Sequence, residues 1–456
     1  MIRRELTSIE QGMEILNKDA GSSNVVTCSC VRGPLSEKIL QQALTLVTNY
    51  HPNLNLQIVE KSSQLYFQPV EDISNIPLRL VKILNREQSQ DVVREELNKK
   101  IESSKGLWRA VLVNLESESD VSYLVTTFHH AIADGLSCIR LHSEILTYCQ
   151  RLVSDKQTFD VYSLPLLPPL PHLLPKSMQG FRGVINAIWY ALRLKFRQNW
   201  HRSQTLGFEQ CVSIKSRRCG LVHKKIDEHL IQLLINLCHQ QKTTVQGALG
   251  AAMLFVVGSH ITAGKVKNVP VNCRSAIDLR TRLKPVISDK NMAPLVSFLM
   301  SFHTLQPQTS FWNLAQDIKK QLDIGLKGND IFCPVLIFRK IVDSLFARPN
   351  QVPLTVSITN IGRVNIPKFY DSFEIEEISF VPSQSAFGGV FAVAVSTFAE
   401  EMVLNFMFSK PSISQETMEI LANEVLGCIV DACRNEDLTF SAFAKRNYLE
   451  KVKEHV

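Results

Sequence analysis

The sequence predicts a protein of the α/β class with two halves of similar size, each an α+β arrangement of helices and strands. The chain has 456 residues, which is enough for two or three domains of about 150 residues each. Its hydrophobic fraction of 45% and charged fraction of 20% are typical of globular proteins and exclude disordered, collagen-like and coiled-coil chains. In both halves, β-forming runs alternate with segments of helical spacing, and a dense group of prolines separates the halves.

The first half alternates between strand and helix patterns. Pro34 and His51-Pro52 bound the first predicted helix, because proline is tolerated in the first helical turn but disfavours helix in the residue before it. The predicted strands are Asn24–Arg32, Leu56–Glu60, Leu65–Pro69, Leu78–Leu84, Trp108–Leu115 and Tyr123–Phe128. The predicted helices are Leu35–Tyr50, Gln88–Ile101 and Leu136–Arg151.

Prolines mark the boundary between the halves. Pro165, Pro168, Pro169, Pro171 and Pro175 fall within eleven residues, a density that is incompatible with a helix or central strand and favours an extended linker. We therefore expect an N-terminal domain at 1–160, a proline-rich linker with a basic crossover helix at 161–210, and a C-terminal domain at 211–456.

The second half repeats the same pattern of elements. The predicted helices are Asp227–His239, Val245–Val257, Phe311–Leu326 and Ser414–Ala432. The predicted strands are Val266–Cys273, Pro353–Thr359, Ile375–Val381, Val390–Phe398 and Met402–Phe408.

Cysteine usage and hydropathy predict a cytoplasmic protein. The eleven cysteines form no disulfide framework, no CxxC motif and no cluster with histidines at zinc spacing, so we expect reduced thiols and no metal. The uncharged runs 243–264 and 379–399 are interrupted by polar residues or by Pro382 and Gly388-Gly389, which favours buried core over a membrane span. The start MIRRELTSIEQG lacks the apolar stretch of a signal peptide.

The motif that carries chemistry follows the strand Tyr123–Phe128 and reads His129-His130-Ala131-Ile132-Ala133-Asp134-Gly135. A neutral imidazole suits the removal of a proton from a hydroxyl or amine that attacks a thioester. Successive residues at a strand end point to opposite faces, so only one histidine can face a cleft. Asp134 is expected to anchor the turn by pairing with an arginine and accepting backbone N–H groups. Gly135 permits a tight turn and a close approach of substrate.

This HHxxxDG pattern resembles the signature of the condensation-domain superfamily. That superfamily includes peptide-synthetase condensation domains, chloramphenicol acetyltransferase, the plant BAHD acyltransferases, alcohol acetyltransferases and the mycobacterial polyketide-associated acyltransferases. Val269–Asp278 resembles its strand with a structural arginine, and Asn291–Ser301 resembles the following buried strand. SITNIGRV at 357–364 is similar to its S-N-x-G segment, with Thr359 in place of Ser. The BAHD signature DFGWG is absent, and so is a carrier-protein serine motif of the GxDS type.

The resemblance implies two chloramphenicol-acetyltransferase-like domains, each a mixed sheet flanked by helices, with a tunnel between them. It assigns the base to His130, with His129 and Gly135 as supporting residues, and it suggests Arg274 as the partner of Asp134. Ser357, Thr359 or Asn360 would form the opposite wall and donate to the thioester oxygen. Alternatively, Thr359 and Asn360 are structural turn residues that close a strand.

The predicted function is transfer of an acyl group from a thioester to a hydroxyl-bearing acceptor. The donor would be acyl-CoA or a phosphopantetheine-linked acyl group on an acyl-carrier protein, with no bound cofactor and no nucleic-acid partner. Two alternatives remain open: an amide-forming condensation protein that acts on carrier-bound substrates, and a catalytically silent binding or adaptor relative.

The crossover segment concentrates the positive charge of the chain. Residues 182–225 carry ten basic residues and one acidic residue, a local charge of +9 in a chain of net charge +7. Apolar residues recur there at steps of three and four: Phe181, Val184, Ile185, Ile188, Trp189, Leu192, Phe196 and Trp200. This pattern fits a helix packed on the domain seam, a helix at a membrane surface through 181–200, or a positive dock for coenzyme A phosphates or an acidic carrier protein.

Overall fold

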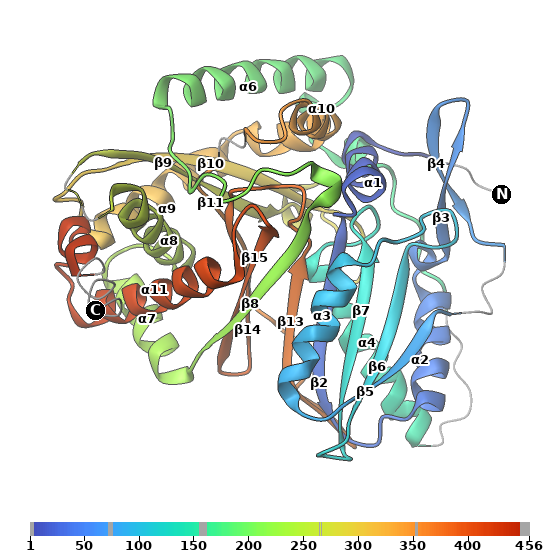
Figure 1. Ribbon diagram of the computed structural model, residues 1–456. Coiled ribbons are helices and arrows are strands. Elements are labelled where there is room, and N and C mark those ends of the chain that lie inside the picture. The colour runs from blue at the N-terminus through green and yellow to red at the C-terminus, as the bar shows by residue number, and fades with distance from the viewer. Residues whose placement is uncertain are drawn as a thin grey trace.

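Two six-stranded mixed sheets, one in each lobe, form the framework of the protein (Figure 1). The computed structural model describes residues 4–71, 76–154, 162–263, 265, 267–351 and 354–446. The predicted domain boundary at 160/161 and the predicted strand starts Val266 and Pro353 lie outside these residues.

The N-terminal lobe is built on the sheet β12-β13-β2-β7-β6-β5. Its strands are β2 (Asn24–Arg32), β5 (Leu78–Ile83), β6 (Trp108–Leu115), β7 (Val121–His129), β12 (Phe369–Tyr370) and β13 (Phe373–Pro382). One face carries α4 with α2 packed against it, and the other carries α3. The helices are α2 (Glu37–Tyr50), α3 (Ser89–Asn98) and α4 (Gly135–Val153). The central strand β7 is buried along its whole length, because helices cover both faces of the sheet.

A smaller sheet and one further helix belong to the same lobe. The three-stranded sheet has the order β1-β4-β3 and consists of β1 (Arg4–Glu5), β3 (Leu56–Lys61) and β4 (Gln64–Pro69). The helix α1 (Ser8–Ala20) begins at a capping box, in which the side chains of Thr7 and Glu10 satisfy each other's backbone N–H groups.

The C-terminal lobe is built on the sheet β10-β9-β11-β14-β15-β8. Its strands are β8 (Arg218–Ile226), β9 (Val269–Asp278), β10 (Val296–Leu305), β11 (Val356–Arg363), β14 (Phe391–Phe398) and β15 (Glu401–Lys410). The helices α7 (Glu228–Gln240), α8 (Val245–Thr262), α9 (Phe311–Lys327) and α11 (Gln415–Arg434) pack around it. Among the described helices, α8 alone is long and apolar enough to cross a membrane, and 78% of it is buried inside the protein.

The C-terminal half of the chain supplies strands to the sheet of the N-terminal lobe. β13 belongs to the second half of the sequence, yet it pairs antiparallel with β2 in the N-terminal sheet, with Ile378 opposite Ser29. The predicted division assumed that residues 211–456 form one separate lobe. They do not, because β13 lies in the sheet of the other lobe. Residues 383–390 connect β13 directly to β14. The pairing of β13 with β2 therefore joins the lobes where their sheets meet.

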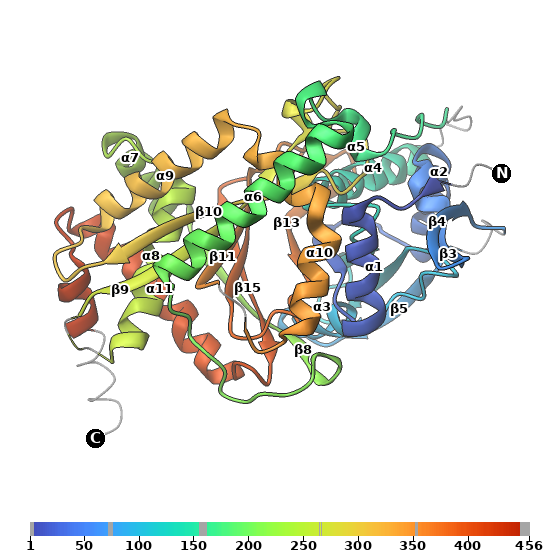
Figure 2. The same cartoon turned by 90° about the horizontal axis from the view of Figure 1, so that it is seen from above.

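Three helices lie at the seam between the lobes, and one of them crosses it (Figure 2). Seen from above, α6 (Gly180–His201) runs across both lobes, with α10 (Cys333–Ala347) beside it and α1 beyond (Figure 2). The short helix α5 (Leu170–Leu173) precedes α6. The predicted crossover helix is thus confirmed, whereas α1, α10 and β8 are elements that the sequence patterns did not indicate.

Candidate active site

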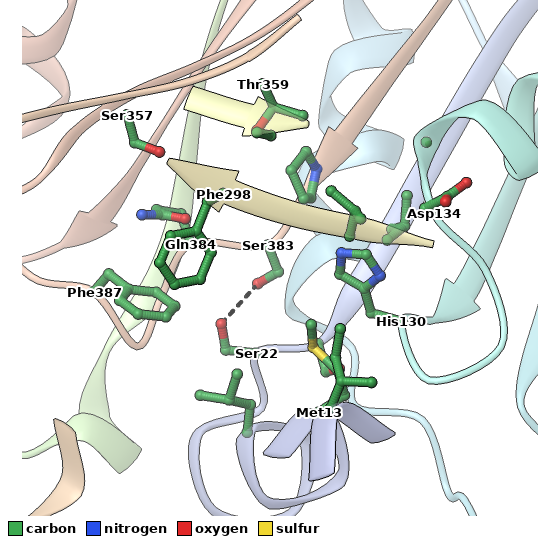
Figure 3. A pocket seen from close by; sticks show the side chains of 18 of the residues that line it. Met13, Ser22, His130, Asp134, Phe298, Ser357, Thr359, Ser383, Gln384 and Phe387 are labelled. Carbon is green, nitrogen blue, oxygen red and sulfur yellow. Dashed lines mark hydrogen bonds between the residues drawn. The ribbon is translucent and has the colours of Figure 1, made fainter. Parts of the chain in front are cut away.

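A cavity of about 150 Å³ lies at the seam, and residues of both lobes line it (Figure 3). Its walls are mostly apolar and come from α1, β10, α10 and β13, including Met13, Phe298, Val335, Phe338 and Phe380. The polar residues of its lining can fix the orientation of a bound molecule: Ser22, Ser23, Asn24, His130, Asp134, Arg274, Ser297, Ser357, Thr359, Ser383 and Gln384.

His130 projects its imidazole into this cavity (Figure 3). The residue follows β7, and its backbone N–H donates to the carbonyl of Ser23 at 2.8 Å, which fixes the direction of the side chain. Nδ1 lies 2.8 Å from the carbonyl oxygen of Ala133, so Nδ1 carries the proton and Nε2 keeps its lone pair. Burial lowers the pKa of His130 against the opposing effects of the Ala133 carbonyl and Asp134, and the ring is therefore neutral at pH 7.

His129 points to the opposite side and is fully buried, as the alternation along a strand predicts. Its Nδ1 accepts from the backbone N–H of Ala131 at 3.1 Å, and its Nε2 lies 2.9 Å from Glu14 of α1. Burial alone would raise the pKa of Glu14, but its bonds with His129 and Ser103 outweigh this and lower it. His129 therefore ties α1, which forms one wall of the cavity, to β7.

Asp134 caps α4 and is saturated with hydrogen bonds. One oxygen accepts from the backbone N–H and the hydroxyl of Ser137, each at 2.9 Å, and the other accepts from the backbone N–H of Leu295 at 3.1 Å. Nη1 and Nη2 of Arg280 donate to both oxygens at 2.9 Å. Burial would raise the pKa of Asp134, yet Arg280 and Ser137 lower it on balance. Because Arg280 and Leu295 belong to the other lobe, this pair closes the seam beside His130.

The predicted partner of Asp134, Arg274, is wrong. Arg274 instead lines the cavity, where its Nε donates to the hydroxyl of Ser357 at 3.0 Å. Its guanidinium lies over the rings of Phe298 and Phe387, at 5.7 and 5.5 Å from their centroids. Burial lowers the pKa of Arg274 to about 10. Both arginines come from the β9 region, but the chain turns after Asp278 and brings Arg280 to the carboxylate.

The wall opposite His130 is formed in part by β11. Ser357 and Thr359 are two positions apart on this strand and both line the cavity. Asn360 is not among the lining residues, and its side-chain oxygen accepts from the backbone N–H of Gly362 at 2.8 Å. The prediction of a substrate-binding Asn360 is therefore corrected: Asn360 lies within β11, where the pairing with β14 becomes irregular, whereas Thr359 faces the cavity.

Gly135 is required by packing rather than by a tight turn. It is the first residue of α4, and a Cβ at this position would lie 2.5 Å from the ring of Phe380 on β13. Any side chain would thus push β13 away from the turn that holds His130.

Two polar residues of the cavity were not found from the sequence. Gln384 is 5% exposed and lines the cavity, and its side-chain nitrogen has no hydrogen-bond partner among the described residues. Ser23 also lines the cavity, with a buried hydroxyl that has no partner within the same ranges. Neither belongs to a recognisable motif, so only the folded structure brings them to His130. In the part of the chain that the structure describes, no group of three or more His, Cys, Asp or Glu residues could hold a metal ion.

Two family models match the sequence. Residues 5–162 match the model of the Condensation domain, and residues 216–409 match that of the Phthiocerol/phthiodiolone dimycocerosyl transferase C-terminus. Both belong to the group of proteins that the HHxxxDG motif indicates. The chain belongs to the superfamily of condensation domains and CoA-dependent acyltransferases. No curated protein sequence matches the chain.

Solved structures of this superfamily share the fold over nearly the whole chain. Trichothecene 15-O-acetyltransferase TRI3 from Fusarium sporotrichioides is 12% identical, with a TM-score of 0.74 over 94% of this chain and 95% of its own. Polyketide synthase associated protein 5 from Mycobacterium tuberculosis is 15% identical, with a TM-score of 0.68 over 95% and 98%. The starter condensation domain of rhizomide synthetase RzmA, solved with C8-CoA, is 12% identical, with a TM-score of 0.70 over 96% of each chain. The predicted two-lobed chloramphenicol-acetyltransferase-like fold is thereby confirmed, and acyl transfer is supported as the class of reaction.

Proposed function

We propose that the protein transfers an acyl group from a thioester to a hydroxyl-bearing acceptor, with His130 as general base. One observation carries the proposal: a neutral imidazole with an unprotonated Nε2 projects into an apolar cavity between the lobes. The donor would be acyl-CoA or a carrier-bound phosphopantetheine thioester.

His130 acts at one atom in this mechanism. Nε2 removes the acceptor's hydroxyl proton as that oxygen attacks the thioester carbonyl carbon, and the carbonyl electron pair moves to its oxygen. When the tetrahedral intermediate collapses, the carbon–sulfur bond breaks and the imidazolium returns its proton to the leaving thiolate. The products are an ester and a free thiol. The apolar walls keep water away and so favour the alcohol over hydrolysis.

The opposite wall would bind the thioester oxygen. The hydroxyl oxygen of Ser357 accepts from Arg274, which leaves its proton free to donate toward the cavity. Gln384 brings two amide N–H groups to the same wall, where they lack a partner among the described residues. Donors fixed in a dry site stabilise a developing oxyanion more than water does. Asp134 is a positioning residue, because all its oxygen lone pairs are already engaged with Ser137, Leu295 and Arg280.

The test compares His130→Ala with His129→Ala in a thiol-release assay, using a panel of acyl-CoA thioesters and alcohols. We expect His130→Ala to lower kcat/KM by about 10²–10⁴-fold, as is typical for loss of a general base. His129→Ala should lower activity less and thermal stability more, since His129 contacts Glu14 and not the cavity. Retention of more than about a tenth of the activity by a folded His130→Ala protein would remove His130 from the mechanism.

The product distinguishes the alternatives. Hydroxylamine cleaves an ester but leaves an amide intact, so a hydroxylamine-resistant product would identify an amide-forming condensation protein. If no thioester is consumed with any acceptor, and His130→Ala changes nothing, the protein is a silent binding relative. Comparison of the same acyl group on coenzyme A and on a carrier protein identifies the donor.

A further inference from the structure

The apolar stripe of α6 faces away from the protein. Its four aromatic residues are largely exposed: Phe181 by 78%, Trp189 by 63%, Phe196 by 70% and Trp200 by 81%. The other large apolar residues of the stripe are exposed as well: Val184, Ile185, Ile188 and Leu192. Among the described residues, eight of the seventeen exposed large hydrophobic side chains lie on this one helix. The helix does pack on the seam, as one of the three interpretations predicted, but this stripe is not the side by which it packs.

The helix contacts the rest of the protein through the side that carries Gly183 and Ala187. Gly183, Ala187 and Tyr190 are buried, at the spacing of one helix face. A Cβ at Gly183 would lie 2.0 Å from the carbonyl oxygen of Met178, in the turn that leads into α6, and 3.3 Å from Leu336 of α10, so this position leaves no room for a side chain. An amphipathic helix on a soluble protein normally turns its large apolar residues inward, and α6 turns them outward.

Positive charge flanks the exposed stripe. Residues 180–201 contain four cations, Arg182, Arg193, Lys195 and Arg197, and no acidic residue. Arg193 pairs with Asp330 at 2.7 Å, and Arg197 bonds Gln321 and lies over the ring of Phe302, so these two residues hold the helix in place. Arg182 and Lys195 are exposed and form no ion pair within the described ranges. On a helical wheel they fall on opposite edges of the stripe.

We propose that α6 docks the protein on an anionic membrane surface, with the stripe inserted at the level of the headgroups. Tryptophan and phenylalanine beside cations suit this zone, because rings and methyl groups leave water while Arg182 and Lys195 meet lipid phosphates. The helix has 22 residues and spans about 33 Å. The four cations of residues 180–201, with no acidic residue among them, favour an anionic lipid surface as the occupant.

The docking surface lies close to the cavity, although the proposal does not depend on the chemistry there. α6 packs on α10, and Pro334, Val335 and Phe338 of α10 line the cavity. One helix layer thus separates the stripe from the site of His130.

The tryptophans make the docking directly observable. The chain has four: Trp108 and Trp312 are 6% and 1% exposed, whereas Trp189 and Trp200 lie on the stripe. The wild-type protein is mixed with vesicles of phosphatidylcholine, with or without about a third of phosphatidylglycerol. We expect a blue shift of emission, quenching by brominated lipids and co-sedimentation with the anionic vesicles.

Two paired variants identify the surface, and a control tests its location. Phe181→Ser/Phe196→Ser and Arg182→Glu/Lys195→Glu keep both tryptophans and alter exposed side chains only. Each should weaken binding to anionic vesicles by at least about tenfold, since a single cation contributes about fivefold. The control Leu84→Ser/Phe369→Ser removes equally exposed apolar residues elsewhere, at 64% and 65% exposure, and should bind like wild type.

Three results would overturn the proposal. The first is no emission shift and no sedimentation with anionic vesicles. The second is equal weakening by the control pair, because binding would then not depend on α6. The third is that wild type does not bind vesicles, while the stripe variants lose dimerisation in sedimentation velocity or lose binding of an acidic carrier protein. The stripe would then serve a protein partner.

Discussion

The ion pair between Asp134 and Arg280 is expected to hold the two lobes together, and Asp134→Asn tests it. The two side chains are 7% and 5% exposed, so neither charge is well solvated when its partner is lost. The substitution removes the charge that faces both Nη atoms of Arg280 and leaves Asp278, at 2.8 Å, as the remaining carboxylate. Breaking a buried pair in this way lowers the free energy of unfolding by about 3–5 kcal/mol. Because Asp278 compensates in part, we expect about 3 kcal/mol.

A double-mutant cycle separates the pair from general damage to the site. Asp134→Asn, Arg280→Met and the double variant are unfolded in urea, and the free energies are extrapolated to water. We expect the double variant to be more stable than the sum of the single effects by about 1–3 kcal/mol. The matched control is the same cycle with Arg274→Met, because Arg274 contacts Ser357 and not Asp134. That cycle should be additive within about 0.5 kcal/mol.

The outcome of the two cycles is decisive. Additive effects of Asp134→Asn and Arg280→Met would show that these groups do not interact in solution. Coupling between Asp134 and Arg274 would restore the pairing that the sequence suggested. The pH dependence provides a second check. The folded pKa of Asp134 is lowered, so its contribution to stability is present above its unfolded pKa of about 3.9 and is lost as pH falls through the folded value. The Asp134→Asn protein should lack this part of the acid loss.

Three further predictions concern the cavity and its walls. Because burial lowers the pKa of His130, the acid limb of the kcat/KM profile should have its midpoint below about 6.5, and a midpoint above that value would contradict a desolvated base. Gly135→Ala should lower activity and melting temperature, and Phe380→Leu should restore part of both if the 2.5 Å contact with the ring is the cause. Glu14→Gln should lower the free energy of unfolding by about 1–3 kcal/mol, the range for a bond to a charged group, and an unchanged urea midpoint would show that His129 does not need it.

The local elements of the fold could be predicted, whereas contacts between distant segments could not. Periodicity identified β2, α4 and β7 because their apolar spacing is visible within about ten residues. The pairing of β13 with β2 joins segments far apart in the sequence, and no local pattern carries that information. Helix α1 was missed although signals were present: Thr7 and Glu10 form a capping box, and Ile9, Met13 and Leu16 recur at helical spacing.

The candidate site divides in the same way. The motif indicated the turn that carries His130, and the alternation along the strand indicated that only one of the two histidines can face the cavity; the family resemblance assigned that position to His130. The partner of Asp134 could not be identified without the structure. Arg274 and Arg280 are six residues apart, and either could reach a carboxylate in the other lobe. What decides between them is the end of β9 at Asp278: Arg274 stays on the strand beside Ser357, and Arg280 leaves it.

The orientation of α6 shows why an apolar stripe alone does not locate a surface. The 3.6-residue period is the same whether a stripe is buried or exposed, so the large residues of α6 predict an amphipathic helix without saying which side meets the protein. The opposite side carries Gly183 and Ala187 four residues apart, and small residues allow the closest approach of a helix to its neighbour. At Gly183 the backbone of Met178, in the turn before α6, and the side chain of Leu336 on α10 exclude a large side chain, and the large residues lie on the free side. A small-residue stripe opposite a large apolar one, with flanking cations, is therefore the sequence pattern that indicates a helix packed by its small side.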